Sequence, residues 1–250
     1  MQGLHWLLLL PLCLFSVAES HAEMRVKLFD GYGSGTGGEF DVRFTTSDVP
    51  DFHFSSAIGT KTWNTRATRL STFCVEKDEF IGFDTEYRAT IDAIAIGGGN
   101  NTNAGDALDP WTAFLYTQFA TGQLVSYDYL PSFGAANLIR EADGGALQQV
   151  IWFLENETRV SSTYGGPTGY GYDPHSRTVA QAYLSGQALA WWDLAAGANW
   201  TTIRNVRVLN LTGLDGSEKQ SQLILIPLPG AALLGVFGLV IAGWVKGRMA

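Results

Sequence analysis

The residue with the clearest chemical potential in this chain is Cys74. The chain has two cysteines, and Cys13 lies in an N-terminal segment that is expected to be removed on export. Cys74 would then be the only cysteine of the exported chain, so it could not form an intramolecular disulfide. Such a thiol is deeply buried, paired between chains, or committed to covalent chemistry, and composition does not choose among these.

Two short motifs give this cysteine a chemical context. Cys74 follows Phe73 in a short apolar segment that predicts a strand, and Gln148 lies in residues 147–152, which predict a helix. In this order the two motifs resemble the thioester domains of bacterial surface adhesins, in which a cysteine and a glutamine are cross-linked. The resemblance covers most of residues 23–212, and it implies a thioester between Cys74 and Gln148.

The chemistry of such a bond explains both residue types. A thiolate is the nucleophile, so Cys74 needs a lowered pKa or a nearby base. It attacks the side-chain carbonyl of Gln148 and expels ammonia, and enforced proximity must supply the rate because an amide is a poor electrophile towards sulfur. A partner's amine would then displace Cys74 and leave an isopeptide bond. This is single-use covalent attachment rather than turnover by an enzyme, and it needs no cofactor or metal.

Helical spacing indicates which glutamine is used. Gln148 shares a helix face with Ile151 and Trp152, and this face is expected to pack on the strands. Gln149 points away from that face. Phe73 and Trp152 are expected to shield the bond from water. The intact exported chain would therefore be lighter than its sequence by one ammonia.

The remaining pattern indicates how these residues are positioned. Period-two alternation predicts strands over residues 24–29, 39–44 and 203–211, and apolar segments predict strands over residues 72–76 and 87–96. Helices are expected over residues 111–121, 146–155 and 176–191, the first of them preceded by the capping pair Asp109 and Pro110. Strands, then helices, then a closing strand favour an α+β fold, with a β-rich barrel or sandwich scaffold and an inserted helical region.

The N-terminus is typical of a secretory signal. An apolar run over residues 6–15 is followed by Ser20-His21-Ala22, which has the small-x-small pattern of a cleavage site. The run is too short to span a bilayer comfortably. Residues 1–22 are therefore expected to be a signal peptide, with an N-terminal membrane anchor as the alternative.

The C-terminus is typical of a stop-transfer segment. An uncharged apolar segment over residues 230–245 predicts a transmembrane helix, and the cations Lys246 and Arg248 follow it. Residues 23–222 are then expected to form one surface domain outside the inner membrane. Residues 223–250 would form its tail.

This tail also resembles a sorting signal. Pro227 and Pro229, the apolar segment and the terminal basic residues are similar to a PEP-CTERM tail of the Val-Pro-Leu-Pro type. The resemblance implies cutting near the two prolines by an exosortase-type enzyme, in a Gram-negative bacterium that makes exopolysaccharide. The protein would then be released or moved to the cell surface. A permanently anchored protein is the alternative.

Composition limits the expected partners. The 250 residues include 29 glycines, 12% are aromatic and 16% charged, and the formal net charge is −8. Such a composition is typical of a β-rich extracellular protein with long loops. An acidic surface argues against nucleic acid and anionic membranes as partners. The expected partners are amine-bearing surface proteins or polysaccharides.

Other kinds of site have weaker support. A hydrolase based on Cys74 and His175 lacks any surrounding signature of such an enzyme. A calcium site at the three loop aspartates Asp92, Asp106 and Asp109 has little support, because solvated carboxylates in loops are commoner than calcium ligands. Sugar stacking is a further use for the aromatic residues Tyr164, Tyr170, Tyr172, Trp191 and Trp192, although the last two are expected to be core and rim. The main alternative function is a non-covalent structural or glycan-binding component of the exopolysaccharide matrix, with Cys74 merely buried.

Overall fold

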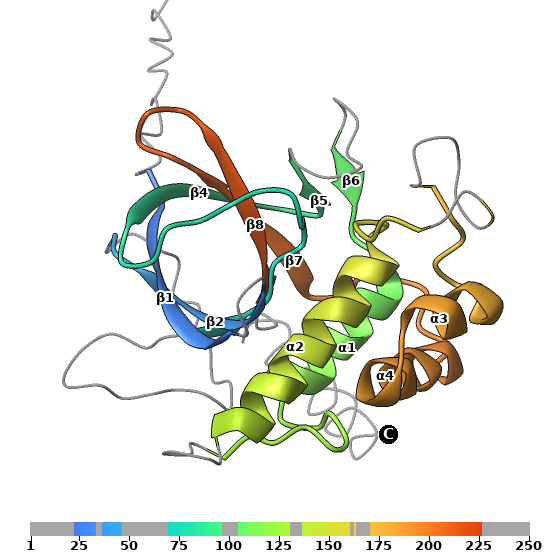
Figure 1. The fold of residues 1–250 in the computed structure, drawn as a ribbon. Helices are drawn as coiled ribbons and strands as arrows, with labels where there is room; N and C mark the ends of the chain where they lie inside the picture. Colours follow the sequence, from blue (N-terminus) through green and yellow to red (C-terminus); the bar gives the residue numbers. More distant parts are fainter. Residues whose placement is uncertain are drawn as a thin grey trace, which may run out of the picture.

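The computed structural model describes residues 23–33, 37–46, 70–96, 105–130, 137–160, 163 and 171–226. These residues form an α+β fold with a six-stranded antiparallel sheet and four helices (Figure 1). The predicted signal peptide and the predicted transmembrane segment 230–245 lie outside the described residues, and so do the tail residues Pro227, Pro229, Lys246 and Arg248. Within the described ranges, no helix has both the length and the apolar character needed to cross a membrane.

The main sheet has the strand order β3-β2-β1-β4-β7-β8, and each neighbouring pair is antiparallel. Its strands are β1 (Arg25–Gly33), β2 (Gly38–Phe44), β3 (Leu70–Thr72), β4 (Glu86–Asp92), β7 (Val206–Thr212) and β8 (Glu218–Leu225). A small second sheet pairs β5 (Ile94–Ala95) with β6 (Asp106–Ala107). Four of the five predicted strand regions are present, with residues 87–96 divided between β4 and β5. The fifth, 72–76, is only partly confirmed, because β3 ends at Thr72 and Cys74 lies just beyond it in an isolated bridge. Strands β6 and β8 were not predicted.

The two edges of the main sheet meet in what we call the seam, formed by residues 73–75 and 221–223. Cys74 pairs with Gln222 of β8 in an isolated antiparallel bridge. Leu223 N donates to Phe73 O at 2.9 Å, and Thr72 Oγ1 donates to Leu223 O at 2.6 Å. The seam therefore gives hydrogen-bond partners to backbone groups that open sheet edges would leave unpaired, and it fixes Cys74 between β3 and β8.

Four helices lie to one side of the sheet in the described structure. They are α1 (Pro110–Ala120), α2 (Asn137–Leu154), α3 (Arg177–Tyr183) and α4 (Gly186–Gly197). In Figure 1, α1 and α2 lie next to the strands, and α3 and α4 lie on their far side. The predicted cap of α1 is confirmed, because Asp109 Oδ1 accepts a hydrogen bond from Trp111 N at 2.7 Å.

Helix α2 differs from the prediction in where it begins. It starts at Asn137 and continues through Gly144, which lies in the stretch that was expected to precede it. A Cβ on Gly144 would lie 3.0 Å from Tyr32 O and 3.2 Å from Glu39 N, so the missing side chain lets α2 approach the backbone of β1 and β2. This close contact outweighs the low helix propensity of glycine.

The predicted helix over residues 176–191 is two helices, so that prediction was wrong. Helix α3 ends at Tyr183, Leu184 is extended with φ −108° and ψ 145°, and Gly186 at the start of α4 has φ +53°. A left-handed residue interrupts the α-helical backbone, and glycine tolerates this conformation without a Cβ clash.

Hydrophobic side chains form two main cores. One lies among the helices and the strands beside them, and it includes Phe73, Phe119, Phe153 and Trp191. The other is enclosed by the sheet and includes Val26, Leu28, Tyr87, Leu209 and Ile224. Leu223 and Ile224 were expected to belong to the tail, but both are buried. The folded part of the chain therefore extends through β8.

Candidate functional site

Gln148 extends from α2 to the backbone of Cys74. Its Oε1 accepts a hydrogen bond from Cys74 N at 3.0 Å, and its Nε2 donates to Cys74 O at 2.8 Å. Gly38 N lies 3.5 Å from the same Oε1. The structure thus brings together two predicted residues that are 74 positions apart in the chain. One bond uses the amide oxygen as acceptor and the other uses the amide nitrogen as donor, so together they fix the orientation of the amide.

The surroundings of Gln148 agree with the predicted helix face. Gln148 is 1% exposed, whereas Gln149 is exposed. Trp152 follows one turn later, and its ring meets the Gln148 side chain over Gly37. A Cβ on Gly37 would lie 2.5 Å from Trp152 Cη2 and 2.7 Å from Gln148 Cγ. Gly37 therefore leaves the space in which these two side chains pack.

The sulfur of Cys74 has a different neighbour. Cys74 is fully buried, and Gln222 Nε2 donates to its Sγ at 3.4 Å. Burial raises the pKa of the Cys74 thiol well above its usual value; the hydrogen bond from Gln222 opposes this shift, and the charge of Glu76 adds to it. The free thiol is therefore neutral, and only a neighbour that takes its proton or supports its charge can make it a nucleophile.

Two backbone N–H groups converge on the carbonyl oxygen of Gln148. They belong to Cys74 and Gly38, at 3.0 and 3.5 Å from Oε1. When a nucleophile attacks a carboxamide, negative charge develops on this oxygen. Donors already directed at it stabilise that charge without rearrangement, so the arrangement favours attack on the Gln148 carbonyl.

Glu76 is a buried carboxyl group in the same segment. It is 1% exposed, its Oε2 accepts from Ser221 N at 2.7 Å, and its Oε1 has no hydrogen-bond partner within the described structure. Burial, with smaller contributions from Glu79 and Glu157, raises the pKa of Glu76 to about 8. Glu76 was not identified from the sequence, although a glutamate at the end of an apolar strand segment is a visible signal.

Aromatic side chains enclose Cys74, but they are not the expected pair. Trp152 is 5% exposed and clusters with Cys74 and Phe40. Phe73 lies instead in the helical core, with its ring edge-on to Phe119 at 4.9 Å. Neighbouring residues of an extended segment point to opposite faces, so Phe73 and Cys74 diverge. Phe40 of β2 takes the place beside Trp152.

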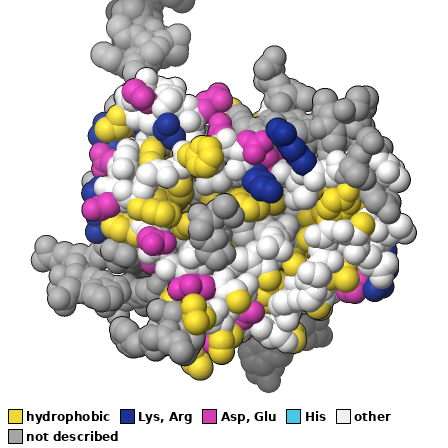
Figure 2. Space-filling view, viewed as in Figure 1, with side chains coloured by type: hydrophobic (Ala, Val, Ile, Leu, Met, Phe, Trp, Pro, Cys, Tyr) yellow, Lys and Arg dark blue, Asp and Glu magenta, His cyan; other side chains and the backbone are white. Residues whose placement is uncertain are grey.

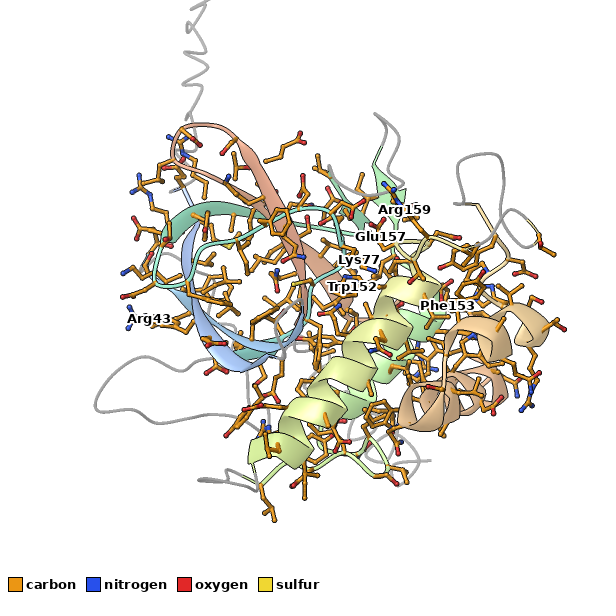
Figure 3. All side chains as sticks on the ribbon, viewed as in Figure 1. Arg43, Lys77, Trp152, Phe153, Glu157 and Arg159 are labelled. Carbon is orange, nitrogen blue, oxygen red and sulfur yellow. The ribbon has the colours of Figure 1, made fainter. Side chains whose placement is uncertain are left out.

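The outer side of Trp152 carries charged groups. Lys77 Nζ lies over the Trp152 ring, 5.5 Å from its centroid, and Lys77 N donates to Glu157 Oε2 at 3.2 Å. Figure 3 shows these residues together where the C-terminal half of α2 faces the sheet. Further along the segment, Phe80 and Phe83 are 82% and 42% exposed. Hydrophobic side chains are also visible over the sheet in Figure 2.

A buried ion pair fixes α2 against β2. Arg140 Nη2 and Nε donate to the two carboxylate oxygens of Glu39 at 2.6 and 2.8 Å. Ser71 Oγ and the Tyr127 hydroxyl also donate to Glu39, at 2.7 and 2.8 Å. Glu39 directly follows Gly38, whose N–H faces Gln148. This network therefore helps to set the distance between the helix that carries Gln148 and the strand beside it.

Where the structure describes them, the other residues that the sequence singled out lie away from the contact between Cys74 and Gln148. His175 Nε2 contacts Asp109 Oδ2 at 3.0 Å, at the start of α1, so its carboxylate partner is Asp109. Tyr172, Trp191 and Trp192 are all buried, so the two tryptophans both lie in the core, and neither lies at the expected rim. Tyr164 and Tyr170 lie outside the described residues. Among the residues that the structure describes, no group of three or more His, Cys, Asp or Glu side chains could hold a metal ion.

The chain matches no protein-family model, no curated protein and no solved structure. The chemistry of the site therefore rests on the contacts among Cys74, Gln148, Gln222 and their neighbours.

Proposed function

We propose that this chain is an exported surface protein in which Cys74 and Gln148 form an internal thioester. The thioester would serve a single covalent attachment to an amine-bearing partner, either a surface protein or a polysaccharide. The observation that carries the proposal is the pair of hydrogen bonds between the Gln148 carboxamide and the backbone of buried Cys74. These bonds hold the carboxamide beside residue 74, and a thiol needs such enforced proximity to attack an amide.

The reaction has two steps. In the first, Cys74 Sγ bonds to Cδ of Gln148, the Cδ–Nε2 bond breaks, and the thiol proton leaves with the nitrogen as ammonia. The N–H groups of Cys74 and Gly38 stabilise the charge on Oε1. In the second, a partner's neutral amine bonds to Cδ, the C–S bond breaks, and a proton from the amine returns to the sulfur.

The architecture and the ends of the chain complete the proposal. The seam supports a closed β-barrel with an inserted helical region, because hydrogen bonds join the segment that follows β3, at one edge of the sheet, to β8 at the other edge. A signal peptide over residues 1–22 would direct export, and an exosortase-type enzyme would cut near Pro227 and Pro229. Before cutting, the segment 230–245 would hold the protein in the inner membrane, with Lys246 and Arg248 on the cytoplasmic side.

Intact-mass analysis of the exported protein tests the thioester. We expect a mass one ammonia below that of the processed sequence, and methylamine should add to Gln148 and release the Cys74 thiol. Cys74→Ala and Gln148→Ala should abolish both effects. Gln149→Ala is the matched control because Gln149 is adjacent but exposed, and it should retain both. The same spectra locate the two processing sites.

An unmodified mass with a free thiol would exclude the thioester. It would favour the alternative, a non-covalent structural or glycan-binding component of the extracellular matrix. One observation favours that alternative: the sulfur of Cys74 is hydrogen-bonded to Gln222, whereas Gln148 bonds to the backbone of Cys74. The burial of Tyr172, Trp191 and Trp192 argues against glycan binding by these residues, because a sugar cannot stack on rings that the fold covers.

A further inference from the structure

Gln222 was not identified from the sequence, yet it is the residue that contacts the sulfur. It is fully buried on β8, across the seam from Cys74. Its Nε2 donates to Cys74 Sγ at 3.4 Å and to Gln220 O at 3.2 Å. Its Oε1 is buried and has no hydrogen-bond partner within the described part of the chain.

A buried carboxamide with an unpaired oxygen has an energetic cost. Nearly all buried polar side-chain atoms in folded proteins are hydrogen-bonded, and an unpaired one destabilises the fold. An apolar residue of the same length would fill this space without that cost. The distinctive contribution of Gln222 is therefore its N–H group on the sulfur.

A donor at this place affects both protonation states of Cys74. An N–H group that faces sulfur favours the thiolate over the thiol, which opposes the effect of burial. It also restricts rotation of the Cys74 side chain. Cys74 is thus held by two glutamines: Gln148 bonds to its backbone, and Gln222 bonds to its sulfur.

We infer that Gln222 is a positioning residue for thioester chemistry, an inference that rests on the proposed function. Its N–H group supports the charge on Cys74 Sγ as the thiol proton passes to the departing nitrogen of Gln148. It supports the same charge again when a partner's amine bonds to Cδ and the C–S bond breaks. Gln222 forms no covalent bond in either step.

Gln222→Met tests this inference, because methionine has a similar length but no donor. Gln220→Met is the matched control: Gln220 is buried on the same strand, and its Nε2 donates to Glu76 O and not to the sulfur. Protein made by cell-free synthesis is followed by intact mass over time. Loss of ammonia should be about ten- to one-hundred-fold slower in Gln222→Met, the factor that a hydrogen bond to a charged group is worth. Gln220→Met should keep the parent rate.

A vibrational measurement separates this role from a purely structural one. In a Gln148→Ala background the sulfur remains a thiol, and its S–H stretching band reports hydrogen bonding to sulfur. Gln222→Met should move that band, and Gln220→Met should leave it in place. Gln222→Leu provides a second donor-free variant if the methionine variant does not fold, which circular dichroism would show.

The measurements distinguish failure of the inference about Gln222 from failure of the proposed thioester. If the parent loses ammonia and Gln222→Met does so at the same rate, Gln222 only fills space and the inference is wrong. An unmoved S–H band in Gln222→Met also contradicts the inference. If the parent itself never loses ammonia, the proposed thioester fails, and the role of Gln222 in it fails too.

Discussion

The carboxamide of Gln148 bonds to both backbone groups of Cys74, much as the peptide groups of a neighbouring strand would. Oε1 accepts from Cys74 N at 3.0 Å, and Nε2 donates to Cys74 O at 2.8 Å. A helix side chain therefore satisfies the segment that follows β3 on the side opposite β8. The contact links stability and the proposed chemistry in one residue, so the two must be measured separately.

Replacement of Gln148 should destabilise the fold even when no thioester can form. In a Cys74→Ala background, Gln148→Ala leaves the buried N–H and C=O of residue 74 without partners. We expect a loss of about 1–3 kcal/mol in the free energy of unfolding, the usual cost of an unsatisfied buried group. Gln149→Ala in the same background should change it by less than about 0.5 kcal/mol, because Gln149 is exposed. Urea denaturation followed by circular dichroism measures both, and equal effects would contradict the contact.

The buried ion pair between Arg140 and Glu39 should contribute far more than an exposed one. Arg140→Met leaves the carboxylate of Glu39 buried without its cation, so we expect a loss of about 3–5 kcal/mol. The exposed pair Arg177–Asp193 is the control, and Arg177→Met should cost no more than about 1 kcal/mol. If the two variants unfold at the same urea concentration, the pair does not anchor α2.

The sequence predicted much of the site because its signals were local. The motif around Cys74 and the helix face of Gln148 each depend on a few adjacent residues, and the structure brings the two predicted residues together, with Gln148 on the expected face of α2. The signal for the cap of α1 at Asp109 is local too, and the prediction of that cap was correct. These features need no knowledge of which distant segments meet.

The features that were missed depend on tertiary contacts. Strand β8 carries the buried polar residues Gln220, Ser221 and Gln222, so no apolar alternation marked it. Its burial follows from the closing of the sheet against the segment after β3, which no local pattern reports. For the same reason Gln222 was not identified, and Phe40 was not seen as the aromatic neighbour of Trp152. The early start of α2 depends on the contact of Gly144 with β1 and β2.

Stability should fall as the pH rises from about 4.5 to about 8, the usual and the folded pKa of Glu76. Between these values the folded chain keeps a proton on Glu76 that the unfolded chain has lost, so a rising pH favours unfolding. One full proton corresponds to about 1.4 kcal/mol per pH unit. Above the folded pKa both states are ionised, and this contribution to the slope ends.

Glu76→Gln isolates this effect from that of other carboxyl groups. Burial also raises the pKa of Glu155, so some slope of the same sign should remain in the variant. The free energy of unfolding is measured by urea denaturation across this pH range, in a Cys74→Ala background so that hydrolysis of a thioester does not interfere. A slope that Glu76→Gln leaves unchanged would show that Glu76 is ionised in the folded protein.

Trp152 should control how long the thioester survives in water. Trp152 is 5% exposed, it clusters with Cys74 and Phe40, and its ring packs with Gln148 over Gly37. Trp152→Ala opens a space beside the bond, so water should reach Cδ and convert Gln148 to glutamate with release of the Cys74 thiol. We expect faster hydrolysis, seen by intact mass as the gain of one water over time. Trp200→Ala is the control, because Trp200 packs on Phe114 and Arg204. Its loss can lower stability, but it opens no path to Cys74. Equal hydrolysis rates in the two variants would mean that access is set by another part of the chain, whereas faster hydrolysis in Trp152→Ala alone assigns the shielding to this ring.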